Sequence, residues 1–226
     1  MISIEDVYFN HLDESKEILK GLNLQIKSAQ RVVIIGASGS GKTTILRLIA
    51  GFIAPTKGLI KFDEVIIAKD AKSYLPPYKR GISMVFQDLA LWPHMNVEEN
   101  VAFGLKMKNI PKNQINEDVK RYLSMVDLQN YNYKRIENLS GGEQQRVALA
   151  RALIVKPKIV LMDEPLSSLD EDLNKQLRRK IVSLQKKLGF SLLYVTHNKE
   201  EAKEIGERII VMKDGVIREK VENVRL

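Results

Sequence analysis

The sequence contains no cysteine, so neither disulfide bonds nor thiolate metal sites can form in this chain. Aromatic residues are also scarce, at 6% of 226 residues, and only one of them is tryptophan. No apolar run approaches the roughly 18 residues that a membrane-spanning helix needs. Residues 1–6 show neither the basic nor the apolar part of a secretory signal. These absences exclude a disulfide scaffold and lead us to expect a soluble protein of the cytoplasm.

Charge is plentiful by contrast, with a formal net charge of +8. A basic excess suits a nucleic-acid surface or a surface facing acidic lipids, and it also suits solvated helix faces. Lysine and arginine are spread along the chain, and their clusters are as short as 178–180 and 186–187. This dispersion favours solvated helix faces.

Hydrophobic periodicity predicts an α/β fold. Alternation over 2–9 and 22–26 predicts two half-buried antiparallel strands, joined by a loop over 10–20. Apolar runs predict further strands at 32–35, 58–67, 82–86, 159–162, 191–196, 209–212 and 216–217. Apolar residues spaced by three and four predict helices within 97–105, 115–126, 141–155 and 171–188. Such alternation of strands and helices indicates a mainly parallel sheet. We expect one domain over 1–226, with a core formed by 1–87 and 157–226 and a helical insertion over 88–156.

A glycine-rich segment follows the strand predicted at 32–35 and precedes a helix. It reads G-x-x-x-x-G-K-T over 36–43, in the strand–turn–helix context that this motif requires. Glycine lets backbone N–H groups surround an anion, and the helix start adds a partial positive charge. Lys42 would reach the β- and γ-phosphates, and the Thr43 hydroxyl would bind Mg²⁺. The residues predicted to bind a nucleoside triphosphate are Gly36, Ala37, Ser38, Gly39, Ser40, Gly41, Lys42, Thr43 and Thr44.

Two acidic residues, Asp163 and Glu164, follow the apolar run at 159–162. The carboxyl end of a buried parallel strand is where such sheets bind ligands. We expect Asp163 to complete the Mg²⁺ shell opposite Thr43, and Glu164 to orient or deprotonate the attacking water. The simpler alternative is an acidic pair that opens a loop.

Ser140 and Glu143 match a helix capping box, with Ser140 as the N-cap. Capping does not explain Gly141 and Gly142, because glycine in a helix is disfavoured by up to about 1 kcal/mol against alanine. Bare backbone at a helix start suits the close approach of an anion. The sequence therefore predicts two anion-binding helix starts, of which one has a lysine.

Residues 139–146, placed between the phosphate loop and Asp163, resemble the signature of ABC-type ATPases. The resemblance covers essentially the whole chain and implies four further site residues. Gln87 would contact Mg²⁺ and the water and would sense a membrane partner. Asp170 would lie in a loop that crosses a dimer interface, although it could merely cap the next helix. His197 would contact the γ-phosphate, although a lone histidine at a strand end is more often structural, and His11 would replace the aromatic residue that usually stacks on adenine.

The same resemblance implies how these residues work together. ATP would be held in a head-to-tail dimer, between the phosphate loop of one copy and Ser140, Gly141 and Gly142 of the other. Lys42, Glu164 and His197 would be catalytic. Thr43, Gln87 and Asp163 would bind the metal.

The segment 89–105, which includes Trp92, resembles ATPases that power importers of polyamines, iron(III), oxyanions and sugars. Integral membrane permease subunits and a solute-binding protein would then be partners, and the chain would lie on the cytoplasmic face of the cell membrane. Core packing is the alternative for Trp92. Many such ATPases carry a further regulatory β-domain, whereas this sequence ends at residue 226.

Two other functions stay open. Glu143 followed by two glutamines is also common in ATPases for lipoprotein release or export. A soluble ABC ATPase acting on nucleic acid or ribosomes is disfavoured, because the gap of about fifty residues between Gln87 and the signature cannot hold the coiled coil of repair proteins. Translation-type members also carry two such domains in one chain. We therefore expect no nucleic-acid partner.

Overall fold

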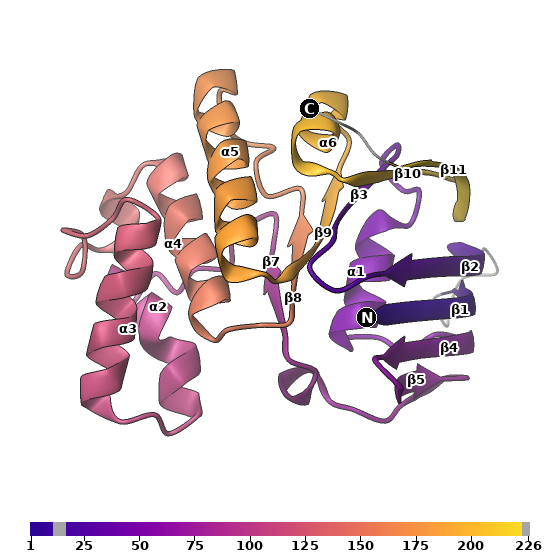
Figure 1. Ribbon diagram of the computed structural model, residues 1–226, viewed down its shortest axis with the longest axis horizontal. Coiled ribbons are helices and arrows are strands. Elements are labelled where there is room, and N and C mark those ends of the chain that lie inside the picture. The colour runs from indigo at the N-terminus through magenta and orange to yellow at the C-terminus, as the bar shows by residue number, and fades with distance from the viewer. Residues whose placement is uncertain (11–16, 223–226) are drawn as a thin grey trace.

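A computed structural model of the protein describes residues 1–10 and 17–222. Its central sheet has six strands in the order β11-β10-β3-β9-β8-β7 (Figure 1). The neighbours from β10 to β7 are parallel, and β11 is antiparallel to β10. The strands are β3 (Arg31–Ile35), β7 (Ile82–Val85), β8 (Ile159–Asp163), β9 (Ser191–Thr196), β10 (Arg208–Lys213) and β11 (Val216–Glu222).

A second, antiparallel sheet has the order β2-β1-β4-β5-β6. The strands are β1 (Ile2–Phe9), β2 (Leu19–Ile26), β4 (Lys57–Phe62), β5 (Val65–Lys69) and β6 (Lys72–Ser73). Ile2 faces Ile26 and Ile4 faces Leu24, so the predicted antiparallel pair is confirmed. The loop predicted over 10–20 is too long, because Leu19 and Lys20 already belong to β2 and Leu19 is fully buried.

The helices are α1 (Lys42–Ala50), α2 (Val97–Met107), α3 (Lys112–Met125), α4 (Gly141–Ile154), α5 (Glu171–Leu188) and α6 (Lys199–Ile205), with 3₁₀ turns at Pro77–Lys79 and Ile136–Asn138. Each predicted helix is therefore present. The best-defined boundaries are those of α5, which starts after the N-cap Asp170 and ends at Gly189 with a φ of 73°. Glycine adopts this left-handed conformation without steric cost, which explains why the helix stops there.

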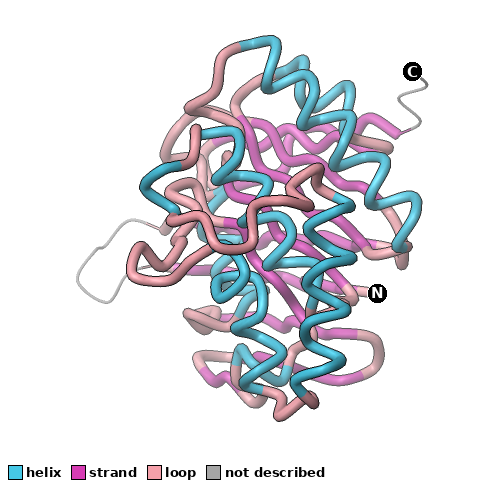
Figure 2. Tube along the Cα trace, turned by 90° about the vertical axis from the view of Figure 1, so that its left-hand side faces the viewer, coloured by secondary structure: helices cyan, strands magenta, loops and turns pink. Residues whose placement is uncertain are grey.

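The core has two parts, one on each face of the central sheet. Alternate residues of β3 point to opposite sides, since Val33 packs in one cluster and Val32 and Ile34 in the other. The first cluster contains buried residues of α2, α3, α4 and α5, and the second contains those of α1 and the antiparallel sheet. Figure 1 shows α1 between the two sheets and α2–α4 together at the far side of α5, and Figure 2 shows these helices in front of the strands.

The strand order brings three chain segments to one place. Ile35 pairs with Thr196 across β3 and β9, and Asp163 pairs with Val195 across β8 and β9. The residues that directly follow these strands, Gly36, Glu164 and His197, are therefore neighbours at one edge of the sheet. Within the described ranges, every helix falls short of the length or apolar character needed to cross a bilayer.

Candidate functional site

The glycine-rich loop closes tightly between β3 and α1. A Cβ on Gly36 would collide with the carbonyl oxygen of Met212 in β10, so no larger residue fits without moving the strand. Gly41 has a φ of 99° and precedes the helix directly. Lys42 folds back over the loop, and its Nζ donates to the carbonyl oxygens of Gly36 at 2.8 Å and Ala37 at 2.9 Å. The buried ammonium group is thus fixed inside the loop, where an anion would lie.

A cavity of about 660 Å³ opens beside this loop. Residues from five separate parts of the chain share it, because the ends of three neighbouring strands meet there. Its walls are Ile18, Ser38, Gly39, Gly41, Lys42, Thr43, Thr44, Gln87, Glu164 and His197. All of these except Ile18 belong to the predicted site. Ala37 and Ser40 lie in the same loop, joined by a backbone hydrogen bond of 3.2 Å, without lining the cavity.

Thr43 and Asp163 form a second polar hollow next to the first. The Thr43 hydroxyl donates to Asp163 Oδ1 at 3.0 Å, and Gln87 and Arg47 line the same hollow. Burial raises the pKa of Asp163, and the hydrogen bond from Thr43 only partly opposes that rise. A cation bound here would offset the cost of burying the carboxylate.

The donors of this hollow fit Mg²⁺, which prefers oxygen ligands and completes its shell with water and phosphates. Among the described residues no group of three or more His, Cys, Asp or Glu side chains could hold a metal ion. A site of one carboxylate and one hydroxyl beside a phosphate loop suits an ion that needs few protein ligands.

Glu164 lines the cavity and has an unusual backbone conformation. Its φ is 44°, and its N–H donates to the carbonyl oxygen of Val195 at 2.9 Å, which ties it to β9. The carboxylate lies 2.8 Å from Nδ1 of His197 and 3.8 Å from Nζ of Lys42. Left-handed backbone at a non-glycine residue is strained and often serves function. The geometry holds one carboxylate between a buried ammonium group and an exposed imidazole.

The second predicted anion-binding helix start, at the beginning of α4, lies away from the phosphate loop. Ser140 caps α4 as expected, since its Oγ accepts from the Glu143 N–H at 3.3 Å and its N–H donates to Glu143 Oε2 at 2.7 Å. Ser140, Gly141 and Gly142 do not line either hollow. In Figure 1, β7 and β8 lie between α4 and α1. Within one chain, the structure does not bring the two helix starts together.

The two glycines of α4 have different surroundings. A Cβ on Gly142 would collide with the side-chain end of Leu173 in α5, whereas a Cβ on Gly141 would meet only Leu169 at 3.6 Å. Packing against Leu173 therefore gives a second reason for glycine at position 142, and the approach of an anion to both glycines stays a prediction. Gly141 is exposed and has no such packing contact within the described chain, so the approach of an anion stays its predicted role.

Two further predicted residues have other placements. Asp170 caps α5, because its Oδ1 accepts from the Leu173 N–H at 3.0 Å. His11 lies outside the described residues. Sequence reasoning missed Ile18 and Arg47. Arg47 lies four residues after Thr43 in α1, so helical spacing could have indicated it, whereas Ile18 falls within the stretch that we expected to be a loop.

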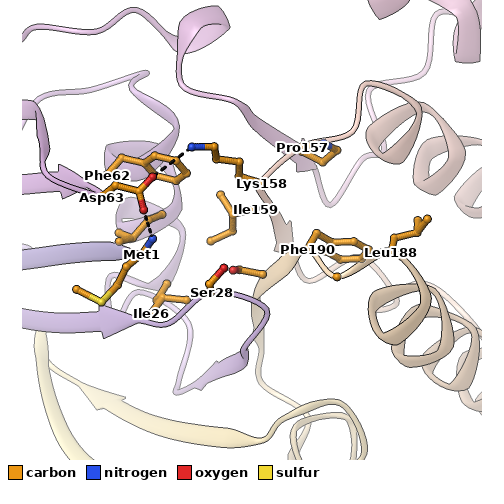
Figure 3. A pocket seen from close by; sticks show the side chains of 13 residues that line it. Met1, Ile26, Ser28, Phe62, Asp63, Pro157, Lys158, Ile159, Leu188 and Phe190 are labelled. Carbon is orange, nitrogen blue, oxygen red and sulfur yellow. Dashed lines mark hydrogen bonds and ion pairs between the residues drawn. The ribbon is translucent and has the colours of Figure 1, made fainter.

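A third cavity, of about 270 Å³, lies at the opposite end of the same strands (Figure 3). It is lined by the first residues of β8 and β9, Ile159 and Ser191. The amino group of Met1 and Nζ of Lys158 both bond to Asp63 beside it, at 2.6 and 3.2 Å. None of the predicted site residues lines this cavity, which separates it from the phosphate loop.

Comparison with known proteins agrees with the site. The family model described as ABC transporter matches residues 19–167. The spermidine/putrescine import ATP-binding protein PotA of Clostridium novyi (strain NT) is 46% identical over 221 residues, which is 97% of this chain and 61% of that protein. The protein of the same name in Acetivibrio thermocellus is 46% identical over 207 residues, covering 92% of this chain and 57% of that protein. The chain thus spans about 60% of the length of the curated relatives it matches.

Solved structures give the same result. The structure of cbiO1 from Clostridium perfringens, part of the ABC transporter complex cbiONQ, has a TM-score of 0.89 and 29% identity, covering 99% of this chain and 88% of that one. The ATP-binding cassette MJ0796, dimeric in a post-hydrolysis state with ADP and Pi, has a TM-score of 0.86 and 32% identity over 100% of both chains. These matches confirm the predicted α/β fold with a P-loop core, and the chain belongs to the ABC transporter family.

Proposed function

We propose that this chain is the ATP-hydrolysing subunit of an import system, and that two copies close around two ATP molecules to drive a membrane permease. The observation that carries the proposal is the convergence of Lys42, Glu164 and His197 on one cavity beside the phosphate loop. Residues 1–87 and 157–226 would form the nucleotide-binding core. The helices within 88–156 would form the insertion that carries the second ATP contact.

Binding of the triphosphate would rest on the loop over 36–44. Its backbone N–H groups and the start of α1 would surround the β- and γ-phosphates. The Nζ of Lys42 would exchange its bonds to Gly36 and Ala37 for phosphate oxygens, which are stronger acceptors because they are charged. Thr43, Asp163 and Gln87 would hold Mg²⁺, which when bound neutralises charge on the phosphates.

Hydrolysis would depend on Glu164. A water in the cavity would attack the γ-phosphorus, the bond from that phosphorus to the ADP oxygen would break, and the proton of the water would pass to the Glu164 carboxylate. His197 supports this role, since its Nδ1 lies 2.8 Å from Glu164 Oε2 and fixes the direction of the carboxylate. Its exposed ring would then be free to contact the γ-phosphate through Nε2.

A second copy would complete the site. Ser140, Gly141 and Gly142 stand at an anion-binding helix start that does not reach the cavity of its own chain. Head-to-tail pairing would place this start against the phosphates of the other copy. The dimeric state of the cassette MJ0796, to which the whole chain is similar, supports this arrangement.

Import of polyamines is the transport function that the relatives favour. Proteins named for spermidine/putrescine import are 46% identical to this chain, and none of the relatives considered above is named for export. We therefore infer that the chain works on the inner face of a membrane through a permease, with a solute-binding protein that delivers the polyamine. Co-purification of the tagged chain with a permease that transports labelled spermidine would test this part.

The catalytic proposal is tested by Glu164→Gln, with Glu117→Gln on the exposed side of α3 as the matched control. We expect Glu164→Gln to keep ATP binding, to lower kcat by about 100-fold or more, and to form a dimer with ATP in light-scattering chromatography. The control variant should match the wild-type chain. A Glu164→Gln variant that is fully active as a monomer would overturn both the catalytic role and the dimer.

A further inference from the structure

The segment that follows Gln87 has an uncommon backbone conformation. Leu89 and Ala90 have φ values of 61° and 44°, in the left-handed region that residues other than glycine rarely adopt. The Gln87 side chain is exposed and forms no hydrogen bond to another described residue. Because the Gln87 side chain has no partner of its own in the described part of the chain, its position depends on the contacts that hold the adjacent backbone at Leu89 and Ala90.

Arg151, in the last turn of α4, fixes that backbone. Its Nη1 donates to the carbonyl oxygen of Ala90 at 2.6 Å, and its Nη2 donates to that of Leu89 at 2.5 Å. The left-handed turn presents two successive carbonyls to one side chain, and the flat guanidinium group can reach both at once. The Cζ of Arg151 also lies 4.8 Å from the centre of the Trp92 ring, in a cation–π contact.

A second helix holds the next residues. Asn100 of α2 is fully buried, accepts from the Trp92 N–H at 2.9 Å and donates to the Trp92 carbonyl oxygen at 3.1 Å. The Trp92 ring also packs against Phe103, with 4.4 Å between the ring centres and 39° between the ring planes. The segment 89–92 is thus fixed between α4 and α2 and has little freedom to move alone.

We propose that Arg151 is a positioning residue for Gln87, and that it links Gln87 to the opposite end of α4. This helix starts at Gly141 and carries Arg151 nearly three turns later. A rigid helix would pass a displacement of its start to the two carbonyls that Arg151 holds. Closure of a second copy on residues 140–142 would then change the position of Gln87. The inference rests on the proposed ATP hydrolysis and extends it to residues outside the cavity.

The test is Arg151→Lys in the full chain, alone and combined with Gln87→Ala. Lysine keeps the charge but cannot hold two carbonyls in one plane. We expect kcat to fall about 5-fold with KM for ATP unchanged, because the phosphate loop is untouched. In the Gln87→Ala background the same substitution should have no further effect. Arg121→Lys, an exposed arginine of α3 with no contact to this segment, is the matched control and should behave as wild type.

Fluorescence gives a readout that is independent of hydrolysis, because Trp92 is the only tryptophan. Arg151→Lys should change the emission of the free protein, and Arg121→Lys should not. An unchanged kcat, or an equal loss of kcat with and without Gln87, would overturn the proposal. If the wild-type chain does not hydrolyse ATP, the proposed function fails, and emission still decides whether Arg151 holds the segment. Should Arg151→Lys unfold at the assay temperature, Trp92→Leu removes the aromatic face over which Arg151 lies, and a loss of kcat that persists without Gln87 would again overturn the proposal.

Discussion

Replacing Gly141 by alanine separates the stability of α4 from its proposed contact with a second copy. Gly141 is the first residue of the helix, and its φ does not lie in the left-handed region. A Cβ there would meet only Leu169 Cδ2, at the ordinary contact distance of 3.6 Å. The free chain therefore has room for the added methyl group. The phosphate of a second copy would not have that room.

The expected changes in stability and activity have opposite signs. Gly→Ala at a compatible position stabilises a protein by about 0.4–1 kcal/mol, because the unfolded chain loses freedom. For a chain of this size the gain corresponds to a rise of about 1–4 °C in Tm. ATP hydrolysis should fall about 10- to 100-fold, since a methyl group at the helix start keeps the phosphate away from the backbone N–H groups.

Gly142→Ala is the matched comparison. Its Cβ would collide with Leu173, so we expect a loss of about 1–3 kcal/mol from overpacking. Calorimetry of both variants measures the change in Tm, and phosphate-release assays measure the change in ATP hydrolysis. A Gly141→Ala variant that is stabilised and fully active would refute the idea that an anion approaches this helix start.

Two further substitutions test hydrogen-bonded carboxylates that do not line the cavity. Tyr194→Phe removes the hydroxyl that donates to Glu201 Oε2 at 2.8 Å, and both side chains are buried. The unmatched carboxylate oxygen should cost about 1–3 kcal/mol in urea unfolding, and an unchanged midpoint would contradict this estimate. Glu143 has its pKa lowered, chiefly by the hydrogen bond from the Tyr131 hydroxyl, so its contribution to stability is present above about pH 4.3 and is lost as pH falls through the lowered value. Glu143→Gln should therefore have a lower Tm than wild type at pH 7, and this difference in Tm should shrink as the pH falls below about 4.3. A difference in Tm that stays constant as the pH falls would argue against the ionic contribution.

Local features of the fold were predictable because they depend on near neighbours in the sequence. Apolar spacing located α5 to the residue, since Asp170 caps one end and Gly189 stops the other. The same spacing could not locate the start of β2. Leu19 and Lys20 follow a polar stretch, and only their pairing with β1 makes them strand residues.

The site was predictable only where a motif carries its own geometry. The phosphate loop brings its strand, turn and helix with it, so Lys42 and Thr43 follow directly from the sequence. The contact between Glu164 and His197 depends on β8 and β9 being neighbours, which the spacing of apolar residues does not specify. Arg151 was missed for a stronger reason. Its partners are backbone carbonyls about sixty residues earlier. Every residue has a backbone carbonyl, so the amino-acid sequence does not indicate which ones accept a hydrogen bond.

The capping of α4 explains why its start can serve a second chain. Four N–H groups at a helix start lack partners within the helix. The box of Ser140 and Glu143 satisfies the N–H groups of these two residues, and it leaves those of Gly141 and Gly142 for an outside acceptor. Among the described residues that line the cavity, Lys42 is the only lysine or arginine. In the proposed dimer, the charge that develops on the γ-phosphate would therefore be met by Lys42 on one side and by the two glycine N–H groups on the other. Because these groups belong to different chains, hydrolysis would require closure of the dimer, and closure is the movement that a permease could use.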